Sequence, residues 1–168
     1  MVYTPQQLVD IEACREAVHR YCRGVDRLDA ALMRSAYWPE ATDDHGVFVG
    51  NAMEFVDRVI ESHRRWAATM HCIYNHSVEL DPTGIKARGE AYNVTYLFGE
   101  KDGPAVSTWW GRYQDLFEKR GSEWRILERV CVHEFNRSDA NVTPMAIEAE
   151  MFRQGSFDRD TPGRQLGP

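Results

Sequence analysis

The sequence of 168 residues predicts an α+β fold, a cone-shaped barrel in which three N-terminal helices pack on a strongly curved antiparallel sheet. Apolar residues recur at helical spacing in the first third of the chain, and from Met70 onward they follow a period of two residues. Short turns containing glycine separate the long alternating segments, as in an antiparallel meander. A sheet that curves around a long helix leaves an open mouth, which is a natural pocket for a small molecule.

The first helix has a clear start in the sequence. Thr4 supplies a hydroxyl cap and Pro5 the first helical position, and apolar residues then follow at helical spacing. This helix is expected to end at about Asp26.

Two further helices are predicted before the sheet. A short one is expected over residues 29–37, where Pro39 ends it, and the polar stretch that follows leads into a short strand around residues 47–49. Asn51 is expected to cap a third helix, whose basic end suits the negative end of the helix dipole.

Four long strands are predicted next, over residues 70–80, 85–98, 105–119 and 124–135. The domain is therefore expected to cover residues 1–137. Residues 138–168 are expected to form an extension, with a short helix over 144–152 and then a disordered tail.

The composition of the chain argues against two classes of function, nucleic-acid binding and membrane association. Twenty Lys and Arg against 26 Asp and Glu give a net charge of −6, which argues against binding to nucleic acid. No apolar run is long enough to span a bilayer and no signal peptide is visible, so no membrane association and a cytoplasmic location are expected. The four widely spaced cysteines suggest reduced thiols.

The candidate site combines an aspartate with a histidine. Asp26 falls at the end of the first helix, and His71 falls at the start of the first long strand. Asp26 would bind one imidazole nitrogen and fix the tautomer, and the other nitrogen would act as a general base in a mostly apolar pocket. Each residue alone also fits a plain structural role, as a helix-end carboxylate or a hydrogen-bonded sheet histidine.

Other polar and aromatic side chains are candidates for the same pocket. Tyr21 and His133 are predicted as catalytic partners that hydrogen-bond a departing group or an oxyanion. Strand alternation places Asn75 on the face of His71 and His76 on the opposite face. The residues predicted to bind substrate are Asn75, Trp38, Trp110 and Arg129, although Arg129 equally suits a surface ion pair.

The absence of known cofactor-binding motifs from the sequence favours chemistry without a cofactor. The sequence contains no glycine-rich nucleotide motif, no phosphate-binding loop and no nucleophile elbow. The acidic stretch around His45 is interpreted as a solvated loop, and no metal site is predicted.

Three stretches resemble SnoaL-like members of the nuclear-transport-factor-2-like superfamily over roughly residues 5–137. They are YCRGVDRLD at 21–29 with AYWPEAT at 36–42, MHCIYN at 70–75, and WWGRYQDLFEKRGSEWRILER at 109–129. The layout is similar to the branch with scytalone dehydratase, hexachlorocyclohexane dehydrochlorinase and bile-acid 7α-dehydratase. This resemblance implies cofactor-free elimination by a His–Asp pair, at the positions of His71 and Asp26.

The resemblance extends to some neighbouring positions and fails at others. A tyrosine of the bile-acid enzyme matches Tyr21, and a His-x-x-x-Asn pattern of the dehydrochlorinase resembles His71 with Asn75. A last-strand arginine of that branch corresponds to His133, and the second histidine of scytalone dehydratase has no counterpart here.

The sequence thus favours a lyase or isomerase that acts on a hydrophobic ring compound. A non-catalytic ligand-binding or partner-subunit module is the alternative, and an epoxide hydrolase that uses Asp26, Arg112 and Asp115 is a third. The apolar outer face of a curved sheet predicts a homodimer or homotrimer, and the resemblance favours the trimer.

Overall fold

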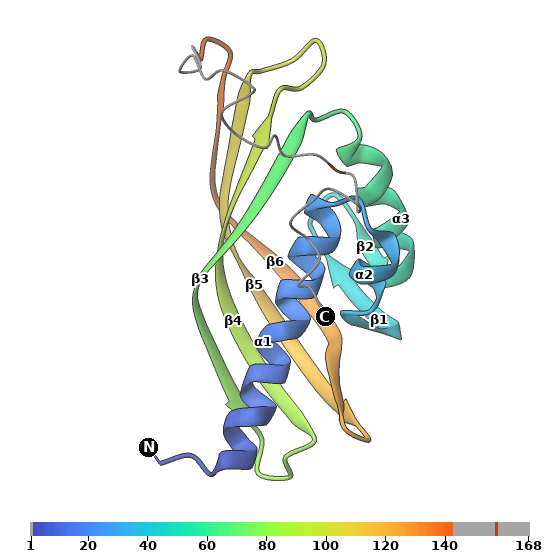
Figure 1. Ribbon diagram of the computed structural model, residues 1–168, viewed down its shortest axis with the longest axis vertical. Helices are drawn as coiled ribbons and strands as arrows, with labels where there is room; N and C mark the ends of the chain where they lie inside the picture. The colour runs from blue at the N-terminus through green and yellow to red at the C-terminus, as the bar shows by residue number, and fades with distance from the viewer. Residues whose placement is uncertain (1, 143–156, 158–168) are drawn as a thin grey trace, which may run out of the picture.

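The computed structural model describes residues 2–142 and residue 157. Within them the chain forms α1 (Pro5–Asp26), α2 (Ala30–Arg34), β1 (Tyr37–Asp44), β2 (Val49–Asn51), α3 (Ala52–His63), β3 (Ala68–Leu80), β4 (Lys86–Phe98), β5 (Val106–Arg120) and β6 (Glu123–Asp139). The strands form one curved sheet; α1 lies along its concave face, and α2 and α3 lie beside β1 and β2 (Figure 1). The predicted α+β class is confirmed.

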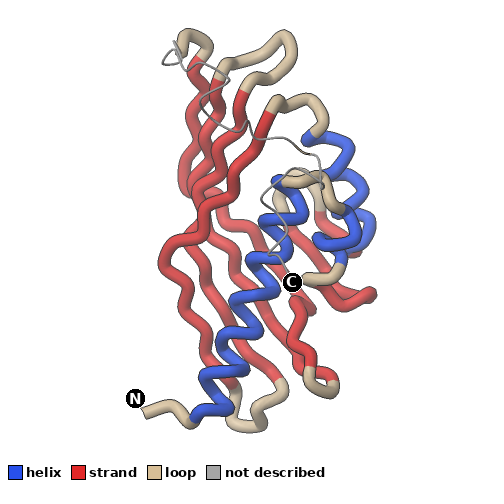
Figure 2. The backbone as a smooth tube through the Cα atoms, viewed as in Figure 1, coloured by secondary structure: helices blue, strands red, loops and turns tan. Residues whose placement is uncertain are grey.

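The sheet has the strand order β2-β1-β6-β5-β4-β3. Strands β3 to β6 form the predicted antiparallel meander of four long strands, and the tube view shows how they bend together around α1 (Figure 2). β1 departs from the expected pattern because it pairs parallel with β6. The sheet stays open between β2 and β3 and is not a closed barrel.

Strand β1 is the element that the sequence pattern missed. Residues 37–44 were expected to end a helix and begin a polar loop, and Pro39 was the reason for that prediction. In the structure the pairing of β1 with β6 is interrupted between Tyr37 and Thr42. A proline is tolerated at such an interruption because its missing N–H removes no ladder hydrogen bond there.

Helix α1 forms as its start signal predicts. The Thr4 hydroxyl accepts a hydrogen bond from the Gln7 backbone N–H, and the Gln7 side chain accepts one from the Thr4 backbone N–H. Near the other end, a Cβ atom on Gly24 would lie 2.6 Å from the Met33 backbone nitrogen. Glycine at this position therefore lets α2 pack close against α1.

Strand β3 contains an irregularity that changes which side chains face inward. Its register with β4 shifts between Ile73 and His76, so β3 carries one more residue than β4 there. His71 lies opposite Thr95, but His76 and not Asn75 continues the row that faces α1. The predicted faces of Asn75 and His76 were therefore wrong, because strict alternation cannot anticipate a bulge.

The ends of the chain bear on two further predictions. β6 continues to Asp139, slightly beyond the predicted domain boundary at 137. The helix expected over 144–152 lies outside the described residues. Among the helices of the described chain, none combines the length and the apolar character needed to cross a bilayer.

Candidate active site

Asp26 and His71 lie in direct contact where the end of α1 meets the start of β3. Asp26 Oδ1 is 2.6 Å from His71 Nδ1, and Asp26 Oδ2 accepts a hydrogen bond of 2.9 Å from the His71 backbone N–H. The Thr69 hydroxyl also donates to Oδ1 at 2.9 Å. The carboxylate is thus held by three donors, and it places the imidazole proton on Nδ1.

This arrangement leaves the other nitrogen of His71 available. No described residue forms a hydrogen bond with His71 Nε2, and the side chains of His71 and Asp26 are 7% and 18% exposed. The pair also lies at the C-terminal end of α1, where the helix dipole favours a positive charge. Asp26 and the end of the helix thus both place negative charge next to the imidazole.

A second histidine, His63 at the end of α3, lies beside His71. The two rings are stacked with centroids 6.1 Å apart, and His63 Nδ1 donates to the Val59 carbonyl at 3.0 Å. Burial lowers the pKa of His63 to about 4, and a charge on His71 acts in the same direction. His63 is therefore neutral near pH 7, and its Nε2 is an acceptor.

Polar side chains continue from His71 across the inner face of β4. Thr95 lies opposite His71 and donates a hydrogen bond of 3.3 Å to Asn93, which is buried. The Asn93 amide in turn donates to the Tyr113 hydroxyl at 2.7 Å. These three residues add hydrogen-bonding groups to an otherwise apolar interior.

A second aspartate–histidine pair lies at the end of β1. Asp43 is fully buried; it accepts a hydrogen bond of 2.6 Å from the Tyr37 hydroxyl and is also bonded to His45 Nδ1. His45 stacks on Phe55 of α3 with centroids 4.2 Å apart, and its Nε2 is 3.3 Å from the Tyr21 hydroxyl. The interpretation of this stretch as a solvated loop was wrong, because β1 carries Asp43 into the core.

Tyr21 connects the two aspartate–histidine pairs. Its hydroxyl meets His45, and its ring meets the His71 ring edge-on with centroids 6.5 Å apart. Burial raises the pKa of Tyr21 well above its usual value, the Asp43 charge acts in the same direction, and the Arg129 charge opposes both. Tyr21 is therefore a neutral phenol near pH 7.

Arg129 is the buried cation beneath this cluster. It forms two hydrogen bonds of 2.7 Å with Asp115, and both side chains are at most 1% exposed. Its guanidinium lies 4.3 Å from the Tyr21 ring centre and 4.2 Å from that of Tyr113. The structure therefore excludes the surface ion pair considered for Arg129, since the pair is in the core.

The remaining predicted residues form no hydrogen bond, ion pair or ring contact with the His71 pair within the described chain. His133 is exposed on β6, opposite Gly111, where its Nε2 is 3.0 Å from Asn136 Oδ1 and its ring is near Trp109. Asn75 is exposed beside the bulge of β3. Trp110 lies opposite Phe135 on the outer face of the sheet, and the two rings are 5.6 Å apart.

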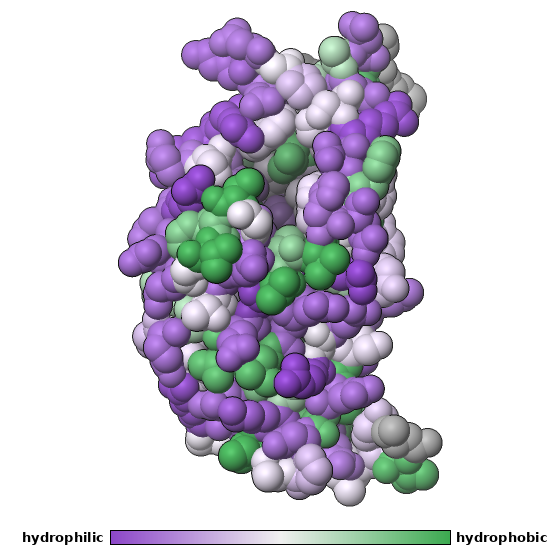
Figure 3. Space-filling model, turned by 180° about the vertical axis from the view of Figure 1, so that it is seen from behind, coloured by the Kyte–Doolittle hydropathy of each residue, from purple (hydrophilic) through white to green (hydrophobic). Residues whose placement is uncertain are grey.

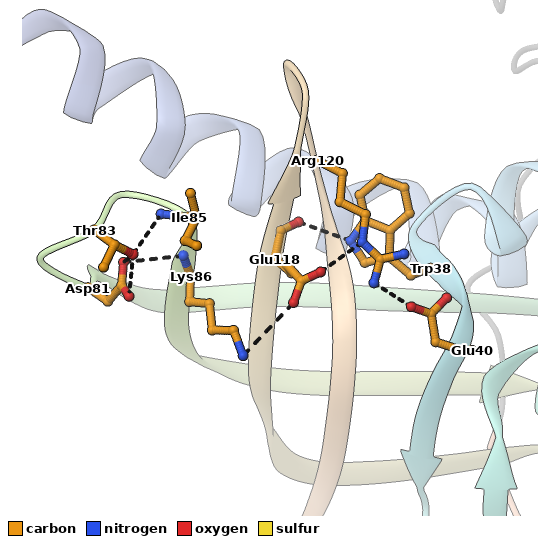
Figure 4. Close-up of polar contacts among 8 residues, drawn as sticks. All are labelled: Trp38, Glu40, Asp81, Thr83, Ile85, Lys86, Glu118 and Arg120. Atoms are coloured by element: carbon orange, nitrogen blue, oxygen red, sulfur yellow. Dashed lines mark hydrogen bonds and ion pairs between the residues drawn. The ribbon is translucent and has the colours of Figure 1, made fainter.

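Trp38 lies at the opposite end of the sheet from His71. Its indole N–H donates to the Glu118 carbonyl at 3.0 Å, and Arg120 lies 4.4 Å above its ring (Figure 4). Arg120 also bonds to the carboxylates of Glu40 and Glu118. Trp38 thus belongs to a charged network that stabilises this end of the sheet.

The acid and arginine set considered for an epoxide hydrolase is not assembled. Arg112 lies on the outer face, where it pairs with Glu90 and Glu134, and Asp115 faces inward and pairs with Arg129. Asp26 is bonded to His71 instead.

Two features of the surface bear on ligand binding. Seen from behind, the surface is hollowed near its middle, and apolar residues gather beside the hollow (Figure 3). Asp26 also lines a small pocket of about 210 Å³, whose other walls include Thr69, Phe98 and Phe157. The carboxylate is thus within reach of a bound molecule.

Two depressed histidine pKa values predict how stability depends on pH. The pKa values of His63 and His76 are both lowered from 6.5 to about 4, mainly by burial. Between these values the unfolded chain binds protons that the folded chain does not, so the free energy of unfolding should fall as the pH drops from about 6.5 to about 4.

His76 offers the cleaner test because neither of its buried ring nitrogens has a hydrogen-bond partner among the described residues. In urea unfolding at several pH values, His76→Leu should lose less stability on acidification than the unsubstituted protein. His133→Leu, at an exposed histidine of β6, is the matched control. An identical pH slope for His76→Leu and the unsubstituted protein would contradict this assignment.

The sequence is similar to one family model and the fold to several solved structures. The model for the SnoaL-like domain matches residues 6–130. A putative scytalone dehydratase from Novosphingobium aromaticivorans is 15% identical with a TM-score of 0.72, over 86% of this chain and 100% of that chain. The hexachlorocyclohexane dehydrochlorinase LinA-type3 from Novosphingobium barchaimii is 18% identical with a TM-score of 0.69, over 84% of this chain and 97% of that chain.

A third neighbour carries no activity in its name. It is a protein of unknown function from Mycobacterium tuberculosis, 20% identical with a TM-score of 0.67, over 78% of this chain and 76% of that chain. A comparison with curated proteins finds no match. At these identities the structural neighbours establish the fold alone, whereas the family model covers most of the chain. The protein therefore belongs to the SnoaL-like domain family.

Proposed function

We propose that the protein is a cofactor-independent lyase of the dehydratase type, or an isomerase, which acts on a hydrophobic ring compound through a general base. The observation that carries this proposal is the bond between Asp26 and His71 Nδ1, together with an Nε2 that has no hydrogen-bond partner among residues 2–142 and 157. Two structural neighbours also bear the names of elimination enzymes, a dehydratase and a dehydrochlorinase.

In the proposed reaction, His71 Nε2 removes a proton from a carbon next to a carbonyl or another activating group. Asp26 keeps the second imidazole proton on Nδ1 and stabilises the imidazolium that forms. The electrons of the broken C–H bond form the new double bond as the leaving group departs with its own electron pair. In an isomerase the same proton would return to another carbon.

Tyr21 is the proposed hydrogen-bond donor to the departing group or to the oxyanion. Its ring adjoins that of His71, and its raised pKa keeps the phenol protonated. His133 and Asn75, the other candidates for this role, make no contact with His71 or Asp26 within the described chain.

The proposal is tested by turnover without added cofactor. A suitable probe is the aldol adduct of acetone and benzaldehyde, a β-hydroxy ketone with an aromatic ring, whose dehydration product absorbs in the ultraviolet. Dehydration above the buffer rate is the expected result. Binding of hydrophobic ring ketones without turnover or exchange of their α-protons would favour the non-catalytic binding module instead.

We also propose that copies of the chain associate through the outer face of the sheet into a homodimer or homotrimer. Large apolar side chains stay exposed there, among them Met70, Tyr92 and Phe135, which is 60% exposed. Light scattering coupled to size exclusion should give an oligomer, and Phe135→Glu should shift it toward the monomer. A monomeric unsubstituted protein would contradict this proposal.

A further inference from the structure

The Tyr21 side chain contacts two aspartate–histidine pairs, His45 through its hydroxyl and His71 through its ring, and only the pair of Asp26 and His71 has a part in the proposed function. The other pair, Asp43 and His45, is built like the first, because in both a buried or half-buried carboxylate binds Nδ1 of the imidazole. In the second pair, Nε2 has a partner, the Tyr21 hydroxyl at 3.3 Å. The result is a continuous chain from Asp43 through His45 to Tyr21.

We propose that Asp43 and His45 form a proton relay that makes Tyr21 the general acid for an oxygen leaving group. The inference rests on the proposed elimination and adds to it the source of the proton that a departing hydroxide or alkoxide must take up. Tyr21 is the catalytic residue that touches this group, and His45 and Asp43 are positioning residues that act through Tyr21.

The buried environment holds this chain in one arrangement. The Tyr37 hydroxyl donates to Asp43 Oδ2, which leaves Oδ1 for His45. The His45 ring is stacked on Phe55, and the Tyr21 ring is fixed by Tyr37, Tyr113 and the Arg129 guanidinium. The side chains that carry the relay therefore lack room to rotate away from one another.

The relay uses the form of His45 that carries a proton on both ring nitrogens. Asp43 accepts the hydrogen bond from Nδ1, so the second proton lies on Nε2, which faces the Tyr21 oxygen. In the protonated form, Nε2–H donates to the Tyr21 oxygen. The phenolic hydrogen of Tyr21 is then free to point toward a substrate.

The proton and electron transfers of the relay balance. As the bond from carbon to the leaving oxygen breaks, the oxygen keeps the electron pair and takes the phenolic proton of Tyr21. The Tyr21 oxygen takes the proton from His45 Nε2, and His45 becomes neutral. His71 has gained the proton from the α-carbon, and exchange of one proton with water at each histidine restores the starting state.

The placement of Tyr21 suits such a reaction. An elimination removes a proton from one carbon and the leaving group from the next, so the acid and the base must lie within the width of one substrate. The rings of Tyr21 and His71 are direct neighbours, and no described residue is interposed between them in their edge-on contact. His45 approaches Tyr21 from the loop that follows β1, and not from the elements that carry His71 and Asp26.

The first test needs no substrate. In nitrogen NMR spectra of the labelled protein, the Nε2 resonance of His45 should shift in Tyr21→Phe, and its Nδ1 resonance should shift in Asp43→Asn. The resonances are assigned by their loss in His45→Gln, and thermal unfolding checks that each variant folds. A His45 Nε2 resonance that is unchanged in Tyr21→Phe would overturn the relay, whatever the protein does with substrates.

The second test compares two leaving groups, with the aldol adduct of acetone and benzaldehyde and its acetate ester as probes. Both give the same product, but acetate leaves without a proton. His45→Gln should lower kcat by ~10²-fold on the hydroxy ketone, within the usual range for an acid–base group, and by only a few-fold on the ester. His71→Ala should lower kcat on both, and His19→Gln, at an exposed position, on neither.

These outcomes separate the relay from the proposed function. Equal losses of kcat on both probes in His45→Gln would mean a merely structural role for His45 and would overturn the relay. A protein that eliminates neither probe would refute the proposed function for this substrate class, and the NMR result would then decide alone whether the relay exists.

Discussion

Replacing His71 by alanine is expected to lower kcat for elimination by ~10²–10⁴-fold, the range that a positioned general base contributes. KM should change little, because the base forms its decisive interaction in the transition state. The physical reason is the geometry of the pair, since Asp26 bonds Nδ1 and His71 Nε2 has no partner among the described residues. Steady-state kinetics on the β-hydroxy ketone and its acetate ester measure the effect.

Asp26→Asn tests the second residue of the same pair. An asparagine amide can donate to Nδ1 and so favour the tautomer with the proton on Nε2, which removes the base. A loss of kcat comparable to that of His71→Ala is therefore expected. His19→Ala is the control, because His19 is an exposed histidine of the same helix. Wild-type turnover in either active-site variant would contradict the assignment of His71 as the base.

Replacing Arg129 by methionine is expected to lower the free energy of unfolding by ~3–5 kcal/mol, because it leaves the Asp115 charge buried without its partner. The double substitution Arg129→Met with Asp115→Leu should cost less than Arg129→Met alone, since it removes both charges together. Urea denaturation, extrapolated to water, measures these differences.

Arg112→Met provides the matched control for Arg129. Arg112 also bonds to carboxylates, those of Glu90 and Glu134, but it does so on the outer face of the sheet. Solvent screens such a pair, and its loss should change stability far less. An equal loss in the free energy of unfolding for Arg129→Met and Arg112→Met would contradict this prediction, because the buried ion pair would then stabilise the protein no more than the surface one.

Much of the fold could be predicted from local signals in the sequence. Thr4 and Pro5 mark the start of α1, and the four long strands follow from alternation between turns. β1 could not be found in this way, because Pro39 and its acidic neighbours are typical of a loop. Its strand geometry depends on β6, which lies far away in the sequence, and no local pattern encodes that pairing.

The candidate site was predictable only in part. The contact between Asp26 and His71 was expected as a dyad, and the family resemblance implied the same two positions; the structure brings Asp26 Oδ1 to 2.6 Å from His71 Nδ1. Asn75 and His76 changed faces because of a bulge, and a bulge has no reliable signature in one sequence.

His45 and His63 were missed as neighbours of the site for a related reason. His45 reaches the core only because β1 is a strand, and His63 reaches His71 only because α3 ends beside β3. The spacing Asp-x-His at residues 43–45 was the one available signal, and it became informative once the strand was known.

The central claim is that His71, held by Asp26, removes a proton from carbon. It is tested most directly by the exchange of deuterium from the α-carbon of a bound ring ketone into water, followed by NMR. The protein is expected to catalyse this exchange, and His71→Ala is expected to abolish it while still binding the ketone. Exchange that proceeds at the same rate without the His71 imidazole would contradict the account.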